Sequence, residues 1–435
     1  MKPRARALTA ALLAALFAVA PAPSATAAET AVPDRIVAVG DVHGSLEDFH
    51  RILEVAGLVD KSGAWIGGGA MLVQTGDLVD RGPNVRGVLD FMRQLERSAA
   101  EHGGRLVSLL GNHEVYNLIG YFDYQATPIT VYREIAAAFA DGRSEKTRKE
   151  AYREWVSWAR RYPGCGPVSP PPTRDLWMLV YPPGFIEYRE ALSPRGEYGQ
   201  WLRQRDVIAR VGDTLFVHGG LSPELIQQGL TSVDAVNARA REDLAQYDRD
   251  REFLENEGVA LPFSTVGEVH CAIAQEIATA QPGVDGAPDL LRGRQLQAIR
   301  DRLPGGGDWL LLRENGPVWF RGYATWTEEE AETELPTIFN AFGGRRIVVG
   351  HTPSAGQILA RFDGRVFLID TAMVYKDLLQ ARAAALEIRP DGVFALYDGE
   401  RLPLAADSEQ VPSSADGNEP SAAANERTEK GSQNP

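Results

Sequence analysis

Residues 35–44 read RIVAVGDVHG, a short apolar run that ends at a glycine and continues with an aspartate and a histidine. Because β-branched residues dominate the run, Arg35–Val39 is predicted to be a buried β-strand. Asp41 and His43 are two residues apart, so an extended backbone turns both side chains to one side. A carboxylate oxygen and an imidazole nitrogen suit a divalent metal ion. Alone, the pattern fits equally well a turn aspartate and an exposed histidine.

Several later stretches repeat the change from an apolar run to a polar or glycine cluster. They predict strands at Met71–Thr75, Leu106–Leu110, Leu215–Val217, Ile347–Val349 and Val366–Ile369. Helical patterns follow the first two strands of the chain, at Leu46–Ala56 and Val85–Ala99. This strand–helix–strand order predicts an α/β protein.

Polar side chains that could bind a metal ion or a phosphate directly follow most of these strands. They are Asp77, Asp80, Arg81, Asn112, His113, His218 and His351. In α/β sheets, ligands bind beyond the carboxyl ends of the strands, so these side chains are predicted to form one site with Asp41 and His43. A lone aspartate or histidine in such a place is usually structural. Four of the seven histidines nevertheless lie in such glycine-flanked positions, which favours a common site, and His50, His102 and His270 are interpreted as structural.

The composition limits the partners of the protein. The chain has 435 residues and a net charge of −14, and an acidic surface argues against duplex nucleic acid as a partner. It leaves a phosphorylated substrate open, because bound metal ions reverse the local field.

The two ends of the chain differ from its middle. Residues 1–28 have a positive start, an apolar run at Leu8–Ala20 and a small-residue cleavage pattern, which predicts a signal peptide and export to the periplasm or the extracellular space. That run is shorter than the ~20 residues of a membrane span, and no later segment is longer, so no stable membrane insertion is expected. The polar tail, residues 406–435, is predicted to be disordered.

The middle, residues 33–405, is predicted to be one domain. Its helical stretches at about 117–210 and 222–300 are interpreted as insertions, because strands continue on both sides. Cys165 and Cys271 fit either one disulfide or two buried thiols.

Five motifs, GDVHG, GDLVDRG, GNHE, HGGLSP and GHTP, occur in this order and resemble those of the calcineurin-like metallophosphoesterases. They are most similar to the phosphoprotein phosphatase branch. The strings WIGGGA, LVQTGDLVDRGP and LLGNHEVYNL further resemble the Shewanella-like protein phosphatases. The resemblance implies a central β-sandwich flanked by helices, with two divalent metal ions (Mn, Fe or Zn) at the strand ends.

The resemblance also implies roles for individual residues. Asp41 and His43 would hold the first metal ion, Asp77 would bridge, and Asn112, His218 and His351 would complete the second. His113 matches the catalytic general acid and Asp80 the carboxylate that orients it. Arg81 and Arg321 match the arginines that bind the substrate phosphate.

One segment departs from the family. The eukaryotic branch carries a tyrosine at the strand exit that here reads Ile369–Met373, without one. Asp370 in this segment is expected either to line the site or to form a turn.

These features predict a metal-dependent phosphatase in which a hydroxide that bridges the two ions attacks phosphorus. The preferred interpretation is a protein phosphatase acting on phosphoserine, phosphothreonine or phosphotyrosine. The alternative is a hydrolase of dinucleoside polyphosphates or other small-molecule phosphoesters. A non-catalytic metal-dependent binding protein is disfavoured, because every catalytic position of the family is filled.

Overall fold

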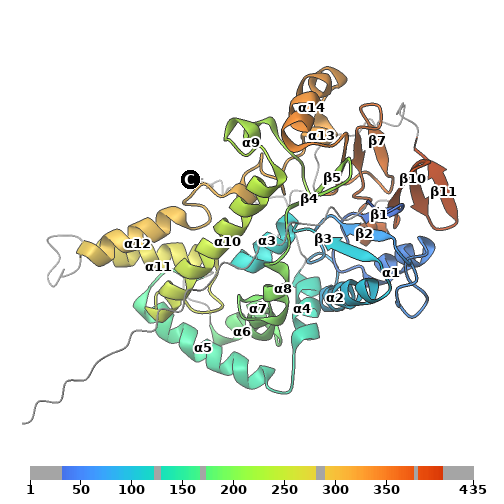
Figure 1. Ribbon diagram of the computed structural model, residues 1–435. Helices are drawn as coiled ribbons and strands as arrows, with labels where there is room; N and C mark the ends of the chain where they lie inside the picture. The colour runs from blue at the N-terminus through green and yellow to red at the C-terminus, as the bar shows by residue number, and fades with distance from the viewer. Residues whose placement is uncertain (1–31, 122–128, 167–172, 281–289, 377–380, 405–435) are drawn as a thin grey trace, which may run out of the picture. The chain divides into compact units, whose positions relative to one another are not determined.

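The computed structural model describes residues 32–121, 129–166, 173–280, 290–376 and 381–404. The predicted signal peptide and the predicted disordered tail lie outside these residues. Within them, two β-sheets face each other and helices pack around them (Figure 1). The α/β class and the central β-sandwich expected from the sequence are therefore confirmed.

The first sheet has six strands in the order β11-β10-β9-β1-β2-β3. Their bounds are β1 Ile36–Val39, β2 Met71–Gln74, β3 Arg105–Ser108, β9 Ala385–Arg389, β10 Gly392–Tyr397 and β11 Glu400–Pro403. The second sheet has five strands in the order β4-β5-β6-β8-β7. Their bounds are β4 Ile208–Val211, β5 Thr214–Val217, β6 Arg346–Val349, β7 Leu359–Arg361 and β8 Val366–Leu368.

Successive side chains of a strand point to opposite faces of its sheet, and this explains how each sheet packs against the other sheet on one face and against helices on the other. In β1, Ile36 and Ala38 face the second sheet and contact a core that includes Phe216 of β5 and Val348 of β6. Val37 and the other alternate residues face the helices instead. Because side chains point to opposite faces with a period of two, a strand buried on both faces reads as one continuous apolar run.

Parallel pairing brings the polar clusters to one edge of the sandwich. β1 pairs parallel with β2, and β2 with β3. β5 pairs parallel with β6, and β6 with β8. The predicted strand Leu106–Leu110 starts one residue late and ends two residues late, because Leu110 leaves the sheet and its N–H donates to the carbonyl of Asp206.

The helices fall into three groups along the chain. Those near the strands are α1 Leu46–Val55, α2 Val85–Glu101, α3 Asn112–Ile119, α13 Gly322–Thr325, α14 Glu328–Phe342 and the 3-10 turns η1 Leu310–Leu312 and η2 Met373–Tyr375. Those between α3 and β4 are α4 Ile129–Phe139, α5 Ser144–Arg161, α6 Arg174–Val180, α7 Phe185–Leu192 and α8 Glu197–Leu202. Those after β5 are α9 Pro223–Gln227, α10 Val233–Asn256, α11 Val266–Thr279 and α12 Leu290–Arg302.

The helices between α3 and β4 are tied covalently to those after β5. Cys165, just after α5, forms a disulfide with Cys271 of α11, which settles the pairing that the sequence left open. β4 starts at Ile208, inside the stretch interpreted from the sequence as helical, because a four-residue edge strand of mixed exposure carries little pattern.

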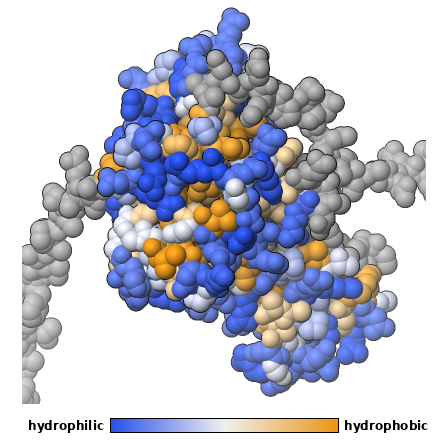
Figure 2. Space-filling model, turned by 90° about the vertical axis from the view of Figure 1, so that its right-hand side faces the viewer, coloured by the Kyte–Doolittle hydropathy of each residue, from blue (hydrophilic) through white to orange (hydrophobic). Residues whose placement is uncertain are grey.

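One face of the molecule mixes hydrophilic and hydrophobic residues (Figure 2). On the face that Figure 2 shows, hydrophilic residues separate the hydrophobic areas from one another. Among the described residues, no helix combines the length and the apolar character that a membrane span requires.

Candidate metal centre

The structure brings the predicted site residues together where the parallel strands of both sheets end. Asp41 follows β1, Asp77 follows β2, His218 follows β5 and His351 follows β6. Hydrogen bonds join these loops: the N–H groups of Val42 and His43 both donate to the carbonyl of Asp77 at 2.9 Å, and the Gly350 N–H donates to the carbonyl of His218 at 2.9 Å. The site is therefore shared by both sheets.

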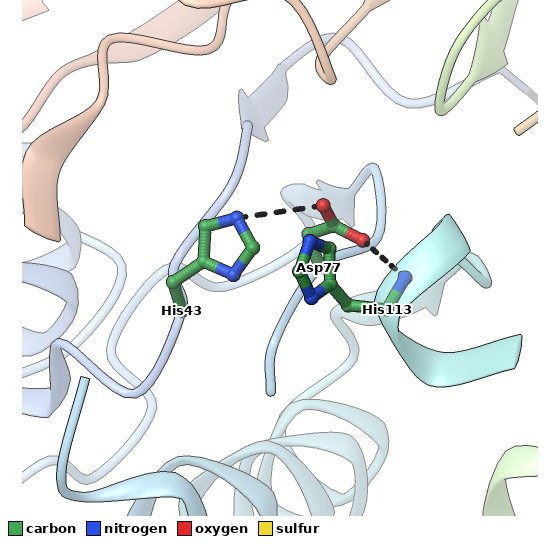
Figure 3. A group of neighbouring side chains, drawn as sticks. All are labelled: His43, Asp77 and His113. Atoms are coloured by element: carbon green, nitrogen blue, oxygen red, sulfur yellow. Dashed lines mark hydrogen bonds and ion pairs between the residues drawn. The ribbon is translucent and has the colours of Figure 1, made fainter. Parts of the chain in front are cut away.

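One group of possible metal ligands consists of His43, Asp77 and His113, all buried (Figure 3). His43 Nε2 lies 3.4 Å from Asp77 Oδ2 and 3.8 Å from Asp41 Oδ2. The other Asp77 oxygen, Oδ1, accepts the backbone N–H of His113 at 3.1 Å. One carboxylate oxygen is thus anchored to α3 and the other points at His43.

A second group consists of Asp77, His218 and His351, also buried. His218 Nε2 lies 3.3 Å from Asp77 Oδ2 and 2.9 Å from Asn112 Oδ1. Asp77 belongs to both groups, so its Oδ2 lies where a carboxylate could bridge two ions. Two ligands that are each about 2.1 Å from one ion lie roughly 3–4 Å apart, which matches these separations.

The hydrogen bonds of the histidines show that this centre fits cations. His43 Nδ1 donates to the carbonyl of Val79 at 2.8 Å, and His218 Nδ1 donates to the carbonyl of Thr75 at 3.0 Å. In a neutral imidazole, each Nε2 then carries a lone pair that faces oxygen lone pairs. His351 Nε2 is buried and makes no hydrogen bond to any described residue. Bonding of the far ring nitrogen to a carbonyl is typical of metal-binding histidines.

The protonation of the histidines agrees with this interpretation. Burial lowers the pKa of His43 well below its ordinary value. Burial, His218 and Arg321 lower the pKa of His351 well below its ordinary value. Both imidazoles are therefore neutral, which is the form that binds a metal ion.

The carboxylates of the centre carry excess negative charge. Burial raises the pKa of Asp41 well above its usual value, and the carboxylates of Asp370 and Asp77 raise it further. Burial alone would raise the pKa of Asp77, but His218, His113 and His43 hold it well below its usual value. A divalent cation would compensate the charge on Asp41.

Asp370, for which the sequence left two roles open, combines them. It is 3% exposed, next to Asp41, and its Oδ1 accepts the N–H of Ala372 at 2.8 Å, as in a turn.

Two glycines make room for the carboxylates. A Cβ on Gly350 would lie 2.4 Å from Asp41 Oδ1, and one on Gly111 would lie 2.2 Å from Asp77 Oδ1. Both distances are far below van der Waals contact, so only glycine allows this approach. The glycines that flank the sequence clusters thus position the ligands.

Glu114 fixes the loop that carries Asp77. It is fully buried, and its Oε1 accepts the N–H groups of Leu78 and Val79 at 2.7 and 3.2 Å. Its Oε2 accepts the N–H groups of Asp77 and Gly111 at 2.7 and 2.8 Å. The sequence placed Glu114 in a motif without giving it a role.

His113 and Asp80 form a hydrogen-bonded pair. His113 Nδ1 lies 2.8 Å from Asp80 Oδ2. Burial lowers the pKa of His113, but the carboxylates of Asp77 and Asp80 outweigh burial and raise it above its ordinary value. A charged imidazole that is held and aimed by a carboxylate can act as a general acid.

Arg81 lies against this pair, and a tyrosine that the sequence did not indicate lies against Arg81. Arg81 Nη2 is 3.3 Å from His113 Nε2, and its Nη1 donates to the hydroxyl of Tyr375 at 3.2 Å. Tyr375 comes just after the strand exit that lacks the family tyrosine, in η2. A tyrosine therefore does reach the site, from a position that the local motif could not reveal.

Arg321 lies beside the second ligand group. Its Nη1 donates to the carbonyl of His351 at 3.1 Å and to Thr352 Oγ1 at 3.2 Å. These bonds anchor the guanidinium beside the second ligand group.

A row of aromatic side chains extends outward from the second ligand group. The Trp319 ring lies 5.6 Å from the His351 ring, and the Tyr116 ring lies 5.2 Å from Trp319. Tyr121 continues the row, 4.7 Å from Tyr116, and is 47% exposed. The Trp319 indole N–H donates to the carbonyl of Leu311 at 3.1 Å, which fixes that ring. Sequence reasoning missed this aromatic row (Trp319, Tyr116 and Tyr121), because Trp319 lies about 200 residues from the two tyrosines in the sequence.

Comparisons with known proteins agree with the geometry. The family model described as calcineurin-like phosphoesterase matches residues 34–355. Shewanella-like protein phosphatase 2 of Arabidopsis thaliana is 32% identical over 218 residues, which cover 46% of this chain and 50% of that protein. Shewanella-like protein phosphatase 1 of Plasmodium berghei is 26% identical over 231 residues, which cover 52% of this chain and 50% of that protein. The chain thus spans about half the length of these curated relatives.

A solved structure extends the likeness over most of the chain. The crystal structure of a cold-active protein tyrosine phosphatase of a psychrophilic Shewanella species superposes with a TM-score of 0.53 and 26% identity. The superposition covers 86% of this chain and 80% of that one.

Proposed function

The chain belongs to the calcineurin-like phosphoesterase family, and we propose that this dimetal phosphatase removes phosphate from phosphotyrosine in proteins. The observation that carries the substrate class is the aromatic row, which begins at the metal centre and ends at the surface. If the phosphate of a phosphotyrosine lies at the metal centre, the phenyl ring of that phosphotyrosine lies within reach of the aromatic row. The likeness to a protein tyrosine phosphatase supports the same substrate.

The ligand sets follow from the two groups of the centre. Asp41, His43 and Asp77 would hold one divalent ion. Asp77, Asn112, His218 and His351 would hold the other, with Asp77 as the bridge. When bound, the two ions supply Lewis acidity toward the phosphoryl oxygens and the attacking water. Asp, Asn and His ligands accept Mn, Fe or Zn alike, so we propose no single metal.

The other polar residues of the site act on the phosphate and the leaving group. Arg81 lies beside His113 and Arg321 beside His351, and guanidinium groups bind phosphate oxygens through paired hydrogen bonds. His113 would give a proton to the leaving phenolate, and Asp80 would keep that imidazole charged and aimed. No covalent phosphoenzyme is required.

The aromatic row would pack against the phenyl ring of the substrate phosphotyrosine. An aromatic pair contributes ~0.5–1.5 kcal/mol beyond area burial, which corresponds to about 2–12-fold in kcat/KM. A phosphothreonine side chain has no ring and would gain little.

The test compares phosphotyrosine and phosphothreonine peptides of identical flanking sequence, together with dinucleoside polyphosphates, after Mn²⁺ is added to metal-free protein. We expect turnover of the phosphotyrosine peptide to be fastest. Trp319→Leu should lower kcat/KM for that peptide by about 2–12-fold and leave the phosphothreonine peptide nearly unchanged.

Trp326→Leu is the matched control, because Trp326 is a half-buried tryptophan of the same segment that packs on Phe320 and Tyr323 instead. A preference of the wild-type enzyme for dinucleoside polyphosphates would replace this proposal with the small-molecule alternative. If Trp319→Leu lowers kcat/KM equally for both peptides, the aromatic row does not determine the preference for phosphotyrosine.

We also propose that the protein is exported. The disulfide between Cys165 and Cys271 supports this proposal, because such bonds persist in oxidising compartments. Thiol labelling of the protein isolated under acid quench should find no free cysteine. Two labelled cysteines in cell fractions that contain the active enzyme would contradict it.

A further inference from the structure

A buried chain of hydrogen bonds leads from the first helical insertion to the His113–Asp80 pair. The hydroxyl of Tyr188 in α7 donates to Asn117 Oδ1 at 2.6 Å. Asn117 Nδ2 donates to Asp80 Oδ2 at 2.8 Å and to the carbonyl of His113 at 2.9 Å. Asp80 Oδ2 also accepts the hydrogen bond of His113 Nδ1. Tyr188 and Asn117 are 1% and 2% exposed.

The donors and acceptors in this series of hydrogen bonds can be arranged in only one way. Asp80 and the His113 carbonyl offer acceptors, so the amide of Asn117 must turn its NH₂ group toward them. Its oxygen then points at Tyr188, which must donate. Burial raises the pKa of Tyr188 well above its ordinary value, and Asp80 raises it further, so this hydroxyl keeps its proton.

Tyr188 therefore prevents the amide from flipping. A flipped Asn117 would place its oxygen against the Asp80 carboxylate, and the repulsion would displace Asp80 from His113. With the Tyr188 hydroxyl in place, a flip would also set the amide NH₂ against an O–H donor and leave a buried group unpaired, which is costly.

A second hydrogen bond from α7 also reaches Asn117, but it binds the backbone of Asn117 and not its side chain. Arg189 Nη1 donates to the backbone carbonyl of Asn117 at 2.7 Å. α7 is thus hydrogen-bonded to α3 through two residues. Tyr188 binds the side chain of Asn117, and Arg189 binds its backbone carbonyl.

We propose that Tyr188 and Asn117 are positioning residues for proton donation by His113, and that the first insertion thereby contributes to the chemistry of the site. This inference rests on the general-acid role given to His113 in the proposed function. A purely structural insertion would affect stability and all substrates alike, whereas positioning of the acid affects only leaving groups that need a proton.

The experiment measures kcat on phenyl phosphate, whose leaving group needs a proton, and on p-nitrophenyl phosphate, whose leaving group does not. Tyr188→Phe should lose roughly ten-fold on phenyl phosphate and less than about two-fold on p-nitrophenyl phosphate. Asn117→Ala tests the chain from its other side and should show the same selective loss. Because both act on one path, the double variant should lose no more than Asn117→Ala alone.

Tyr198→Phe is the matched control. Tyr198 is also a buried tyrosine of this insertion, and its hydroxyl donates to a carboxylate, Asp90 Oδ1, at the same 2.6 Å, but away from His113. It should lower the urea midpoint as Tyr188→Phe does and leave the ratio of the two substrates unchanged.

Equal losses on both substrates in Tyr188→Phe and Asn117→Ala, or no loss in either, would overturn the inference. His113→Asn separates this failure from that of the proposed function. If His113→Asn loses more activity on phenyl phosphate than on p-nitrophenyl phosphate while Tyr188→Phe and Asn117→Ala do not, His113 is the general acid but Tyr188 and Asn117 do not position it.

Discussion

Replacement of Glu114 by glutamine tests whether buried backbone donors hold the metal centre together. The change keeps the size of the side chain but turns one carboxylate oxygen into an NH₂ group. Each oxygen of Glu114 accepts two backbone N–H groups, so two of the four donors lose their acceptor and face another donor. A buried unpaired N–H costs about 1–3 kcal/mol, so Glu114→Gln should destabilise the protein by about 2–6 kcal/mol.

Urea unfolding of the metal-free protein measures this loss directly. Glu330→Gln is the matched control, because Glu330 is also the third residue of a helix and accepts a backbone N–H, that of Thr327, at 2.7 Å, but at the surface. It should cost under about 1 kcal/mol. Metal affinity of Glu114→Gln should fall by about 10–100-fold, since the loop of Asp77 loosens. A loss in Glu114→Gln no larger than in Glu330→Gln would refute the reasoning.

Three further variants test the centre and a group of ion pairs on the first sheet. Asp77→Asn should lose both metal ions and activity together, and a variant that binds two equivalents and turns over normally would contradict the bridge. His113→Asn should keep its metal but lose about 10²–10⁴-fold in kcat on phenyl phosphate, and less on p-nitrophenyl phosphate. Glu387 is 3% exposed and contacts three arginines, which hold its pKa at about 2 against burial. Since this pKa lies below the unfolded value of 4.5, the stabilisation is complete above pH 4.5 and is lost as the pH falls toward 2. Glu387→Gln should therefore cost ~1–2 kcal/mol at pH 7, after allowance for the solvent exposure of the arginines, and almost nothing once the pH is below its folded pKa of about 2, with the exposed Glu400→Gln as control.

Local patterns in the sequence were sufficient for the strands and for much of the centre. A strand buried on both faces must be apolar along its length, and a ligand at its end must follow a glycine where another loop approaches closely. Asp41, Asp77 and His351 meet both conditions, so each could be found without the fold. His218 meets the first condition and has its glycine on the following side, at Gly219. Arg321 lies outside any such strand end, and only the resemblance to the family pointed to it.

The residues that sequence reasoning missed act across long separations. Tyr375 contacts Arg81 and Tyr188 contacts Asn117, and neither pair has a spacing that recurs in a helix or a strand. A tyrosine in an amphipathic helix is ordinarily a core residue, and Tyr188 also packs on Phe139 in the usual way. Only the three-dimensional arrangement shows that its hydroxyl points at Asn117.

Backbone strain is concentrated at this centre, which holds six of the nine non-glycine residues with a positive φ in the described part of the chain. His43, Asp77, Asp80, Arg81, His351 and Ala372 all have a positive φ, between 46° and 65°, and all lie at or beside the centre. Such a conformation costs a non-glycine residue ~1–2 kcal/mol, and it persists only where the surroundings impose it. Here they do: the His43 N–H is held by the carbonyl of Asp77, and the His351 N–H by Asp41 Oδ1 at 3.0 Å. A glycine in place of His43, Asp77 or His351 would relieve the strain but remove the possible ligand. The fold therefore maintains strain where side chains of several strands must point into one small volume, and the hydrogen bonds of Glu114 and Asn117 offset part of its cost.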